Sequence, residues 1–567
     1  MSTKNMFKLK AQEITPLGYE EDAAEVLAMS KTKEELVKNL QTIGQKGEVN
    51  ALTYGYAEDV AANLSNWDPD VRASACEALG NMGQAAEMYV NEIAKLLTSD
   101  AASVRAAAAT AVGMFGHSSA PHVETLKWLM SNDSDEGVRC AAVGALGQIG
   151  VEEQAGAMAE LLASKSPVVV AAAVQALGQL GSAGETQAAA IAAKLDDPQV
   201  RYAAVCSLLS LGEGAVAEHA DAVISKCLPD PDSLTRMAAA EAIGQLKPET
   251  GVKLIPKIAA YLKDDHAGVR CSAALTLGYL GQWVPEAEGL KALLDDKAED
   301  KSELSLTIGG GSMRSPPSAR RPKCAALVAL GMLGVGKLAG DCAECLTDDE
   351  WEVRMCALEC LAQLGDAGRD QSSQISTCLE DDVFVVRTKA CECLGALKAE
   401  DSAHNLPDVF EDRAPSVRAA ALMALAETPD VAKEYPNEVF KLLGDQTANV
   451  QAAAIVCLGS MGETGQSFAS VIATKLYDED ASVRAAACEA LGKLGDHGAA
   501  FAEEVAANLS DGAPEVRMKA ARALGSMGQD GAPFCNELGF MMDDVSAEVS
   551  MAAKEAMLSL EKLAINN

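Results

Sequence analysis

A unit of about 33 residues recurs along most of the chain, and this repeat constrains the fold more than any other feature. Residues 478–495, DEDASVRAAACEALGKLG, are one copy. With the position of Arg484 as anchor, 15 copies align, at spacings of 31 to 35 residues and one of 53. The anchors are Arg72, Arg105, Arg139, Val170, Arg201, Arg236, Arg270, Lys323, Arg354, Arg387, Arg418, Gln451, Arg484, Arg517 and Ser550. Such regularity predicts a linear array of stacked units instead of several globular domains.

Each unit has the apolar spacing of an amphipathic helix after its anchor. Small residues occupy the third position past the anchor, small or aliphatic residues occupy the fourth in all units but the last, and the seventh is apolar in every unit, from Leu79 to Met557. Gly stands at position +8 in eleven units and at +11 in eleven, where a left-handed conformation would end a helix. A second amphipathic stretch precedes each anchor, as at 505–509. Each unit is therefore predicted to be a pair of helices.

An Asp lies six residues before the anchor in ten units, including Asp478 and Asp511. An Asp at the start of a helix can accept hydrogen bonds from free amides and meets the positive end of the helix dipole. Arg484 and Arg517 are the anchors of the same two units, and each can reach the Asp of a neighbouring unit. We therefore predict a structural ladder of Asp and Arg side chains along the stack.

The pattern D-x-x-x-x-V-R-x-x-A-x-x-A-L-G-x-x-G resembles the HEAT repeat, in particular the short Ala- and Gly-rich form of phycobilisome-lyase-type proteins. The similarity covers roughly residues 55–560. It implies an all-α fold, a right-handed α-solenoid of about 15 helix pairs with an N-terminal cap. In such proteins the second helix of each pair lines a concave surface. The signatures of tetratricopeptide and ankyrin repeats are absent from the sequence.

The segment between Arg270 and Lys323 exceeds the period by about 20 residues. The expected organisation is a cap at 1–50, repeats at 51–294, a flexible inserted loop at 295–322, and repeats at 323–567.

The inserted loop combines a Gly run and a Pro pair with basic residues Arg314, Arg320 and Arg321. Ser315 precedes a Pro and is a candidate phosphorylation site beside those arginines. Three interpretations stay open: a regulatory loop, an insertion without a role, or a segment that folds back onto the repeats.

Charge and composition narrow the possible functions. The chain holds 82 acidic and 47 basic residues, a formal net charge of -35, which argues against nucleic-acid binding. The 16 cysteines are scattered through Ala-rich helices without the spacing of a disulfide framework, which indicates a reducing compartment. Because we find neither an apolar signal segment nor a long apolar run, we expect a cytoplasmic protein without membrane insertion.

The residues give little support to an enzyme. None of the six histidines is followed by Glu, which excludes the di-iron site of HEAT-repeat hydroxylases. Cys342 and Cys345 form a C-x-x-C motif, yet the cysteines around it occupy small-residue positions of predicted helices, so we interpret them as core residues. No metal, cofactor or catalytic residue is predicted. The resemblance keeps one enzymatic alternative open, a phycobilin-lyase-like factor that attaches a chromophore.

Position +5 of the second helices carries a recurrent carboxylate, which we name the glutamate stripe. Its members are Glu77, Glu241, Glu359, Glu392, Glu489 and Glu555. Gln175 is a polar relative at the same position and Arg522 is an exception. If second helices line the concave side, the stripe could hold a basic or extended partner; otherwise it is a solvated surface neutralised by pairs such as Glu489 with Lys493. We predict a non-enzymatic scaffold that binds proteins, with a transport-receptor-like carrier of basic cargo as a further alternative.

Overall fold

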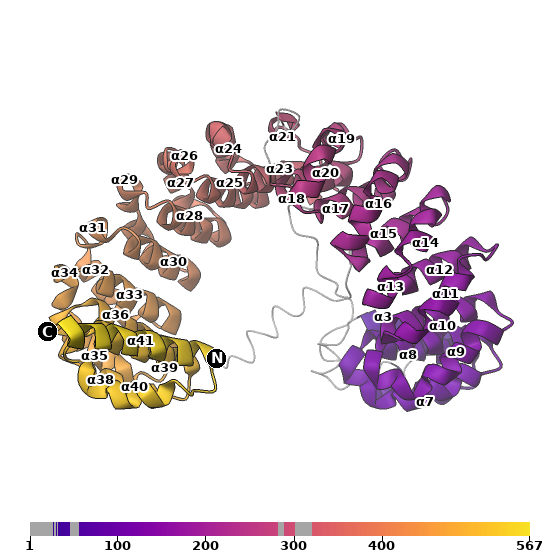
Figure 1. Ribbon diagram of the computed structural model, residues 1–567, viewed down its shortest axis with the longest axis horizontal. Helices are drawn as coiled ribbons and strands as arrows, with labels where there is room; N and C mark the ends of the chain where they lie inside the picture. The colour runs from indigo at the N-terminus through magenta and orange to yellow at the C-terminus, as the bar shows by residue number, and fades with distance from the viewer. Residues whose placement is uncertain are drawn as a thin grey trace. The chain divides into compact units, whose positions relative to one another are not determined.

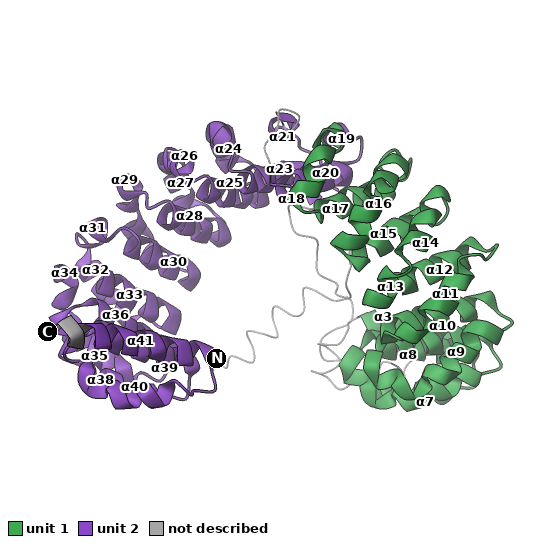
Figure 2. Cartoon of the chain, viewed as in Figure 1, with its two compact units in different colours: residues 1–261, 304–313 green, residues 262–303, 314–567 purple. Residues whose placement is uncertain are grey.

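A computed structural model describes residues 27, 30, 32–45, 56–281, 288–300 and 320–566 of the chain (Figure 1). Every regular element in these ranges is a helix. The described residues form two compact units, one up to Tyr261 and one from Leu262 onward (Figure 2). Each unit is a row of helix pairs, so the predicted all-α solenoid is confirmed.

Unit 1 contains six second helices, which lie side by side in one layer (Figure 1). They are α6 (Pro69–Asn81), α8 (Ala102–Met114), α10 (Glu136–Ile149), α12 (Pro167–Gly178), α15 (Arg201–Leu211) and α17 (Ser233–Gly244). Apart from α3, which is described below, the other α-helices of this unit are α5 (Tyr56–Ala61), α7 (Val90–Lys95), α9 (Val123–Asn132), α11 (Ala155–Leu161), α13 (Gly181–Glu185), α14 (Ala188–Ala192), α16 (Glu213–Lys226), α18 (Pro248–Gly251) and α19 (Ile255–Ala259).

Unit 2 contains nine second helices in a corresponding layer. They are α20 (Ala267–Tyr279), α23 (Pro322–Met332), α25 (Trp351–Gln363), α28 (Phe384–Ala396), α30 (Pro415–Ala426), α33 (Ala448–Ser460), α36 (Ala481–Lys493), α39 (Pro514–Ser526) and α41 (Ala547–Asn566). The first helices are shorter: α21 (Gly289–Leu293), α24 (Ala339–Glu344), α27 (Ser372–Thr377), the 3-10 helix η13 (Leu406–Val409), α32 (Pro436–Lys441), α35 (Ala469–Thr474), α38 (Ala502–Ala507) and α40 (Cys535–Met541). One-turn helices precede five of them: α26 (Asp366–Arg369), α29 (Glu400–Ala403), α31 (Pro429–Ala432), α34 (Glu463–Gln466) and α37 (Asp496–Ala499).

The apolar residue at position +7 of each second helix forms the centre of the core. In 14 of the 15 repeats this side chain is buried, from Leu79 to Leu524. Met557 of α41 is only half-buried. The helical spacing found in the sequence therefore identifies the face that each second helix turns inward.

Small residues set the distance between successive second helices. A Cβ atom added to Gly459 of α33 would lie 2.8 Å from the Cα of Ala490 in α36. Real Cβ atoms do not approach a Cα atom so closely, so only Gly fits at this +8 position. Only the Cβ of Ala490 lies between the two backbones, and each helix pair covers the apolar face of the preceding pair.

The eleven Gly residues at position +11 all have a positive φ, between 52° and 94°. Gly150 has the left-handed C-cap conformation that the sequence predicts. Gly495 instead has φ 57° and ψ -141°, a region that essentially only Gly adopts, and it leads directly into α37. The prediction of positive φ is therefore confirmed, whereas the expected left-handed cap is replaced at Gly495 by a sharper turn into the next helix.

Within the segment expected to form the N-terminal cap, a helix, α3, extends over Lys33–Gln45. Its first turn is capped by Thr32, whose Oγ1 accepts a hydrogen bond of 3.2 Å from the amide of Glu35. A Cβ added to Gly44 would lie 2.7 Å from the Cα of Ala78, so α3 packs against α6 with the spacing of the repeats. No helix in the described ranges is long and apolar enough to cross a membrane.

The substitution Gly459→Val tests whether close backbone contact holds the stack together. We expect the free energy of unfolding to fall by about 2–3 kcal/mol, because the added side chain must separate α33 from α36. Gly444→Ala is a matched control, since a Cβ there meets nothing within 4 Å. Urea denaturation measures both variants, and hydrogen exchange should rise in α33 and α36 only for Gly459→Val. Equal stability of the two variants would contradict this account of the stacking.

Candidate protein-binding surface

Six of the anchor arginines join successive repeats through two-pronged ion pairs. Arg484 donates from Nε to Asp511 Oδ2 at 2.7 Å and from Nη2 to Asp511 Oδ1 at 2.9 Å. Its Nη1 donates to the backbone carbonyl of Asp478 at 2.8 Å. Arg517 repeats this arrangement with Asp511 and Asp544. The structure thus brings together Asp478, Arg484, Asp511 and Arg517.

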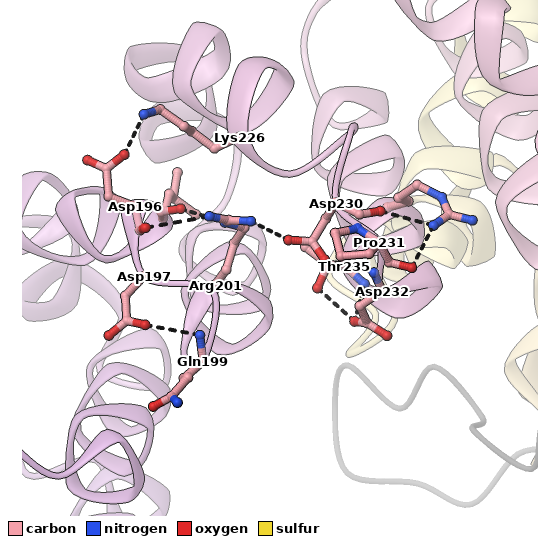
Figure 3. A network of polar contacts seen from close by, with 11 residues as sticks. Asp196, Asp197, Gln199, Arg201, Lys226, Asp230, Pro231, Asp232 and Thr235 are labelled. Carbon is pink, nitrogen blue, oxygen red and sulfur yellow. Dashed lines mark hydrogen bonds and ion pairs between the residues drawn. The ribbon is translucent and has the colours of Figure 1, made fainter.

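The same contact recurs in both units. In unit 2 the side-chain pairs are Arg270–Asp296, Lys323–Asp348, Arg354–Asp381, Arg387–Asp412, Arg418–Asp445, Arg484–Asp511 and Arg517–Asp544. In unit 1 they are Arg105–Asp133 and Arg201–Asp230. Figure 3 shows Arg201 bonded to the carboxylate of Asp230. Arg201 Nε also donates to the carbonyl of Leu195 at 2.6 Å, and the carbonyl of Asp230 accepts from Arg236 Nη1 at 3.0 Å.

Each ladder Asp also fixes the loop that leads into its second helix. Asp511 Oδ1 accepts a hydrogen bond of 2.8 Å from the amide of Ala513, the residue before α39 begins. The Asp therefore accepts a hydrogen bond from a free amide at the start of the helix, as the sequence suggested. It lies two residues before the N-cap residue and is not the N-cap itself. The bond from Arg484 holds the pKa of Asp511 below its usual value, and the bond from Arg517 does the same for Asp544.

Among the four repeats whose anchor is not Arg, one uses a substitute that the sequence did not indicate. Gln451 occupies the anchor, and its Nε2 donates to the carbonyl of Asp445 at 2.7 Å, as an Arg would. Lys475 of the following repeat then donates to Gln451 Oε1 at 2.7 Å and to Asp478 Oδ2 at 3.2 Å. The ladder is therefore continued through Lys475, which supplies the missing positive charge.

The glutamate stripe is divided between the units, with Glu77 and Glu241 in unit 1 and the other four members in unit 2. In unit 2 its members are paired with cations of the same surface. Lys389 lies 3.4 Å from Glu359 and 2.9 Å from Glu392.

The remaining two stripe residues of unit 2 are also paired. Glu489 accepts from Lys493 at 2.7 Å and also pairs with Lys519 of the next helix. Burial acts to raise the pKa of Glu489, but these two cations outweigh it and leave the pKa lowered. Glu555 lies 3.6 Å from Arg522. The stripe in unit 2 is therefore a row of ion pairs with little net charge.

Exposed apolar side chains lie on the same layer and were not identified from the sequence. Tyr279 of α20 is 58% exposed and Met423 of α30 is 47% exposed. Met332 of α23 is also exposed, and a Cβ added to Gly278 would lie 3.1 Å from its Sδ, so Met332 sits beside the end of α20. Tyr279 and Met332 both stand at position +9, and Met423 stands at position +5. Their residue types are unusual for these positions, and this was the signal in the sequence that could have identified them.

The described ends of the inserted loop are tied to unit 2. The amide of Asp300 donates to the carbonyl of Arg320 at 2.7 Å. Arg321 lies 3.5 Å from Glu299 and 3.2 Å from Glu350. A cavity of about 460 Å³ lies beside these ends, lined by acidic and basic side chains that include Asp295 and Arg321. Arg314 and Ser315 lie outside the described residues.

Thirteen of the 16 cysteines are buried thiols in the core, and Cys140, Cys206 and Cys535 are half-buried. Burial raises the pKa of Cys391 and of Cys488 to about 12. Cys360 Sγ lies 3.7 Å from Cys342 Sγ, and this contact together with burial raises the pKa of Cys360. Thiols with raised pKa values stay protonated and are poor nucleophiles and metal ligands. In the described ranges, no three side chains of His, Cys, Asp or Glu are arranged to hold a metal ion.

The sequence is similar to that of known repeat proteins. The sequence pattern of HEAT repeats matches residues 57–124, 123–209, 220–304, 436–502 and 469–557, more than half of the chain. A second pattern, of the single HEAT repeat, matches residues 341–367. The sequence matches none of the curated proteins with which it was compared.

Solved structures of karyopherins have a similar fold. Kap121p bound to the extreme C-terminus of the protein phosphatase Cdc14p has a TM-score of 0.60 and 12% identity, over 94% of this chain and 69% of that chain. Kap121p bound to the SUMO protease Ulp1p has a TM-score of 0.58 and 12% identity, over 96% and 73%. Yeast importin-beta (Kap95p) has a TM-score of 0.57 and 12% identity, over 100% and 88%. Identity this low establishes similarity of fold alone.

The substitution Arg484→Gln tests the energetic role of the ladder. At neutral pH we expect unfolding to become easier by about 2 kcal/mol, because charged hydrogen bonds between largely buried groups are lost. Without Arg484 the pKa of Asp511 returns toward its ordinary value near 3.9. A carboxyl whose folded pKa is depressed stabilises the fold above its unfolded pKa and loses that contribution as pH falls through the folded pKa. Urea denaturation should therefore show the two proteins converging below about pH 4.

The matched control is Arg369→Gln. Arg369 pairs with Asp366 inside the one-turn helix α26, and its Nε donates to the carbonyl of Leu397 at the end of α28, so it makes no ion pair between repeats. We expect a smaller effect that does not depend on pH near 4, since exposed ion pairs contribute little. A difference between wild type and Arg484→Gln that persists unchanged at low pH would contradict the assignment to the Asp511 pair.

Proposed function

The chain belongs to the HEAT-repeat family, and from this premise we propose that it is a non-enzymatic scaffold that binds partner proteins on its layer of second helices. The observation that carries the proposal is the pair of exposed side chains Tyr279 and Met423 on the second-helix layer of unit 2. Aromatic and Met side chains are enriched at protein interfaces, where a few of them supply most of the binding energy.

The ion pairs around these side chains suit the same role. Pairs such as Lys389 with Glu392 leave the surface nearly neutral, so that it can be covered without burying a large uncompensated charge. A surface of apolar anchors within a rim of paired charges is typical of reversible protein association. The 16 free cysteines suit a reducing compartment, and we therefore place the protein inside the cell.

The first test is affinity capture from native extract with wild type, Tyr279→Asp and Met423→Asp. We expect specific partners to be lost with both variants, because a charge at an interface anchor typically costs about 2 kcal/mol or more, roughly thirtyfold in affinity. Val471→Asp is the matched control, since Val471 is an exposed apolar residue of first helix α35.

Partners that are retained by both second-helix variants, or lost equally with Val471→Asp, would refute this binding surface. All three positions are exposed, so thermal unfolding should be nearly unchanged and should exclude misfolding as the cause. A purified protein with visible absorbance would favour the phycobilin-lyase-like alternative instead.

A second candidate function is a carrier of basic, extended segments, related to the karyopherin-like fold and to the glutamate stripe. Karyopherin Kap121p has been solved with the extreme C-terminus of another protein bound. For this chain the candidate requires that Glu359 and Glu392 exchange Lys389 for a cation of the cargo. The requirement leads to a direct test of whether the stripe binds positive charge.

In Lys389→Met the two glutamates lose their internal cation, and we expect a basic peptide to bind about fivefold more tightly, since each exposed ion pair contributes up to about 1 kcal/mol. Fluorescence anisotropy of a labelled Lys- and Arg-rich peptide measures the affinity at low and at physiological salt. Lys433→Met is the matched control, because Lys433 pairs with Asp430 at the start of first helix α31. An unchanged affinity, or an equal gain in the control, would exclude the carrier of basic cargo and leave the scaffold.

A further inference from the structure

Two successive second helices of unit 2 begin with an exposed aromatic residue. Position -3, three residues before the anchor, is Ala or Pro in ten of the 15 repeats, and both residue types suit the first turn of a helix. At this position α25 begins with Trp351, which is 37% exposed, and α28 begins with Phe384, which is 51% exposed. The fold requires neither ring there, and both leave apolar surface in contact with water. We name these two residues the aromatic pair.

The two rings belong to helices that lie side by side (Figure 1). Arg354, three residues after Trp351, donates from Nε to Asp381 Oδ2 at 2.6 Å, and Asp381 lies three residues before Phe384. This bond brings together the starts of α25 and α28. Because the axes of packed helices are about 8–10 Å apart, the aromatic pair offers two anchors at the separation of one repeat.

Each ring of the aromatic pair has an exposed acidic residue two positions before it. Asp349 precedes Trp351 in this way, and Asp382 precedes Phe384. The anchor arginines of the two repeats donate to the backbone carbonyls of these Asp residues, at 3.3 and 3.2 Å. Their carboxylates have no hydrogen bond or ion pair to any residue that the structure describes. A cation can therefore bind here without displacing an internal one, in contrast to the glutamate stripe.

Basic residues in the flanking repeats limit this acidic surface to the aromatic pair. Position -3 is Arg320 in the repeat before, and position -5 is the exposed Arg413 in the repeat after. Beside Trp351, Glu352 Oε2 is enclosed by the protein and lacks a hydrogen-bond partner within the described ranges. An enclosed carboxylate oxygen without a donor costs free energy, which a nearby cation reduces. The surface therefore suits two positive groups and not a longer run of them.

We propose that the aromatic pair, with Asp349 and Asp382, binds an extended basic segment of a partner protein in which Arg residues stand at alternate positions. A guanidinium can stack on an aromatic ring and pair with a carboxylate at the same time, which an ammonium group does less well. In an extended chain, residues i and i+2 point to the same side about 7 Å apart, so two long Arg side chains can reach rings on neighbouring helices. The inference rests on the proposed function, since it names one class of partner for unit 2.

Fluorescence anisotropy with the purified full chain tests the proposal. The probe is a labelled nine-residue peptide of alternating Arg and Gly. We expect Trp351→Ala and Phe384→Ala each to weaken its binding about three- to fivefold, and the double variant about tenfold or more. Asp349→Asn and Asp382→Asn should each weaken it by about two- to fivefold. Glu479→Gln is the matched control and should change nothing, because Glu479 is also exposed at position -5 but its repeat has no aromatic residue at -3.

The composition of the peptide separates this proposal from other occupants. A copy with Lys in place of Arg should bind several-fold more weakly, since the ammonium group stacks less well. Equal binding of the Lys copy, or an equal loss with Glu479→Gln, would show general attraction to a chain of net charge -35 and would overturn the proposal. An uncharged copy with Leu in place of Arg that binds as tightly would identify an apolar partner and would also overturn it.

Two features of the experiment keep its result unambiguous. The substituted side chains are exposed, so thermal unfolding should be nearly unchanged in every variant. The peptide is defined, so its binding is measured whether or not cellular partners are captured through Tyr279 and Met423. Failure of the capture experiment and failure of this one are therefore distinguishable.

Discussion

Contact between the backbones of successive second helices is the constraint on which the rest of the structure depends. A helix pair in this chain cannot enclose its own apolar residues, so each pair uses the next one as the other half of its core. The approach is so close that a Cβ on Gly525 would lie 2.7 Å from the Cα of Ala556. Between helices packed at this distance there is room only for small residues such as Ala, Gly and Cys, together with one aliphatic residue per turn. This explains why aromatic residues make up only 4% of a chain that is 49% hydrophobic.

The ladder of Asp and Arg side chains joins successive repeats at their polar edge, and contacts between small residues join them in the core. Close stacking brings the loops before successive second helices together and removes much of their solvent, which leaves carbonyl groups and carboxylates in need of donors. One guanidinium meets this need on two repeats at once, since Arg387 bonds to the carbonyl of Asp381 in its own repeat and to the carboxylate of Asp412 in the next. Gln451 with Lys475 shows that the requirement is for charge and donors at that point and not for Arg itself.

The repeated positions were predictable from the sequence because stacking imposes the same demand on every unit. The buried column that includes Leu491, the positive φ of the +11 glycines and the helix that begins near Thr32 all follow from local patterns. The neutralisation of the glutamate stripe followed from them only in part, as the pair of Glu489 with Lys493 within one helix. Lys519 meets Glu489 across 30 residues of sequence, and position +2, where Lys519 and Lys389 stand, holds Ala, Ser or Cys in every other repeat. A stripe judged from one position per repeat therefore showed more net charge than its surface has.

Residues that depart from the repeat pattern can indicate a specific function, which the repeated residues cannot. Some departures occur at positions that stacking leaves free, such as Tyr279, where any side chain fits and an aromatic residue in water has no role in the fold. Others occur at positions that stacking controls, such as Gln451, where Lys475 supplies the charge of the missing Arg. The first class marks surfaces that the repeats expose, and the second marks joints between repeats that differ from the others. Because the repeated residues satisfy the fold alone, specific function in a chain of this kind has to be sought in these two classes of exception.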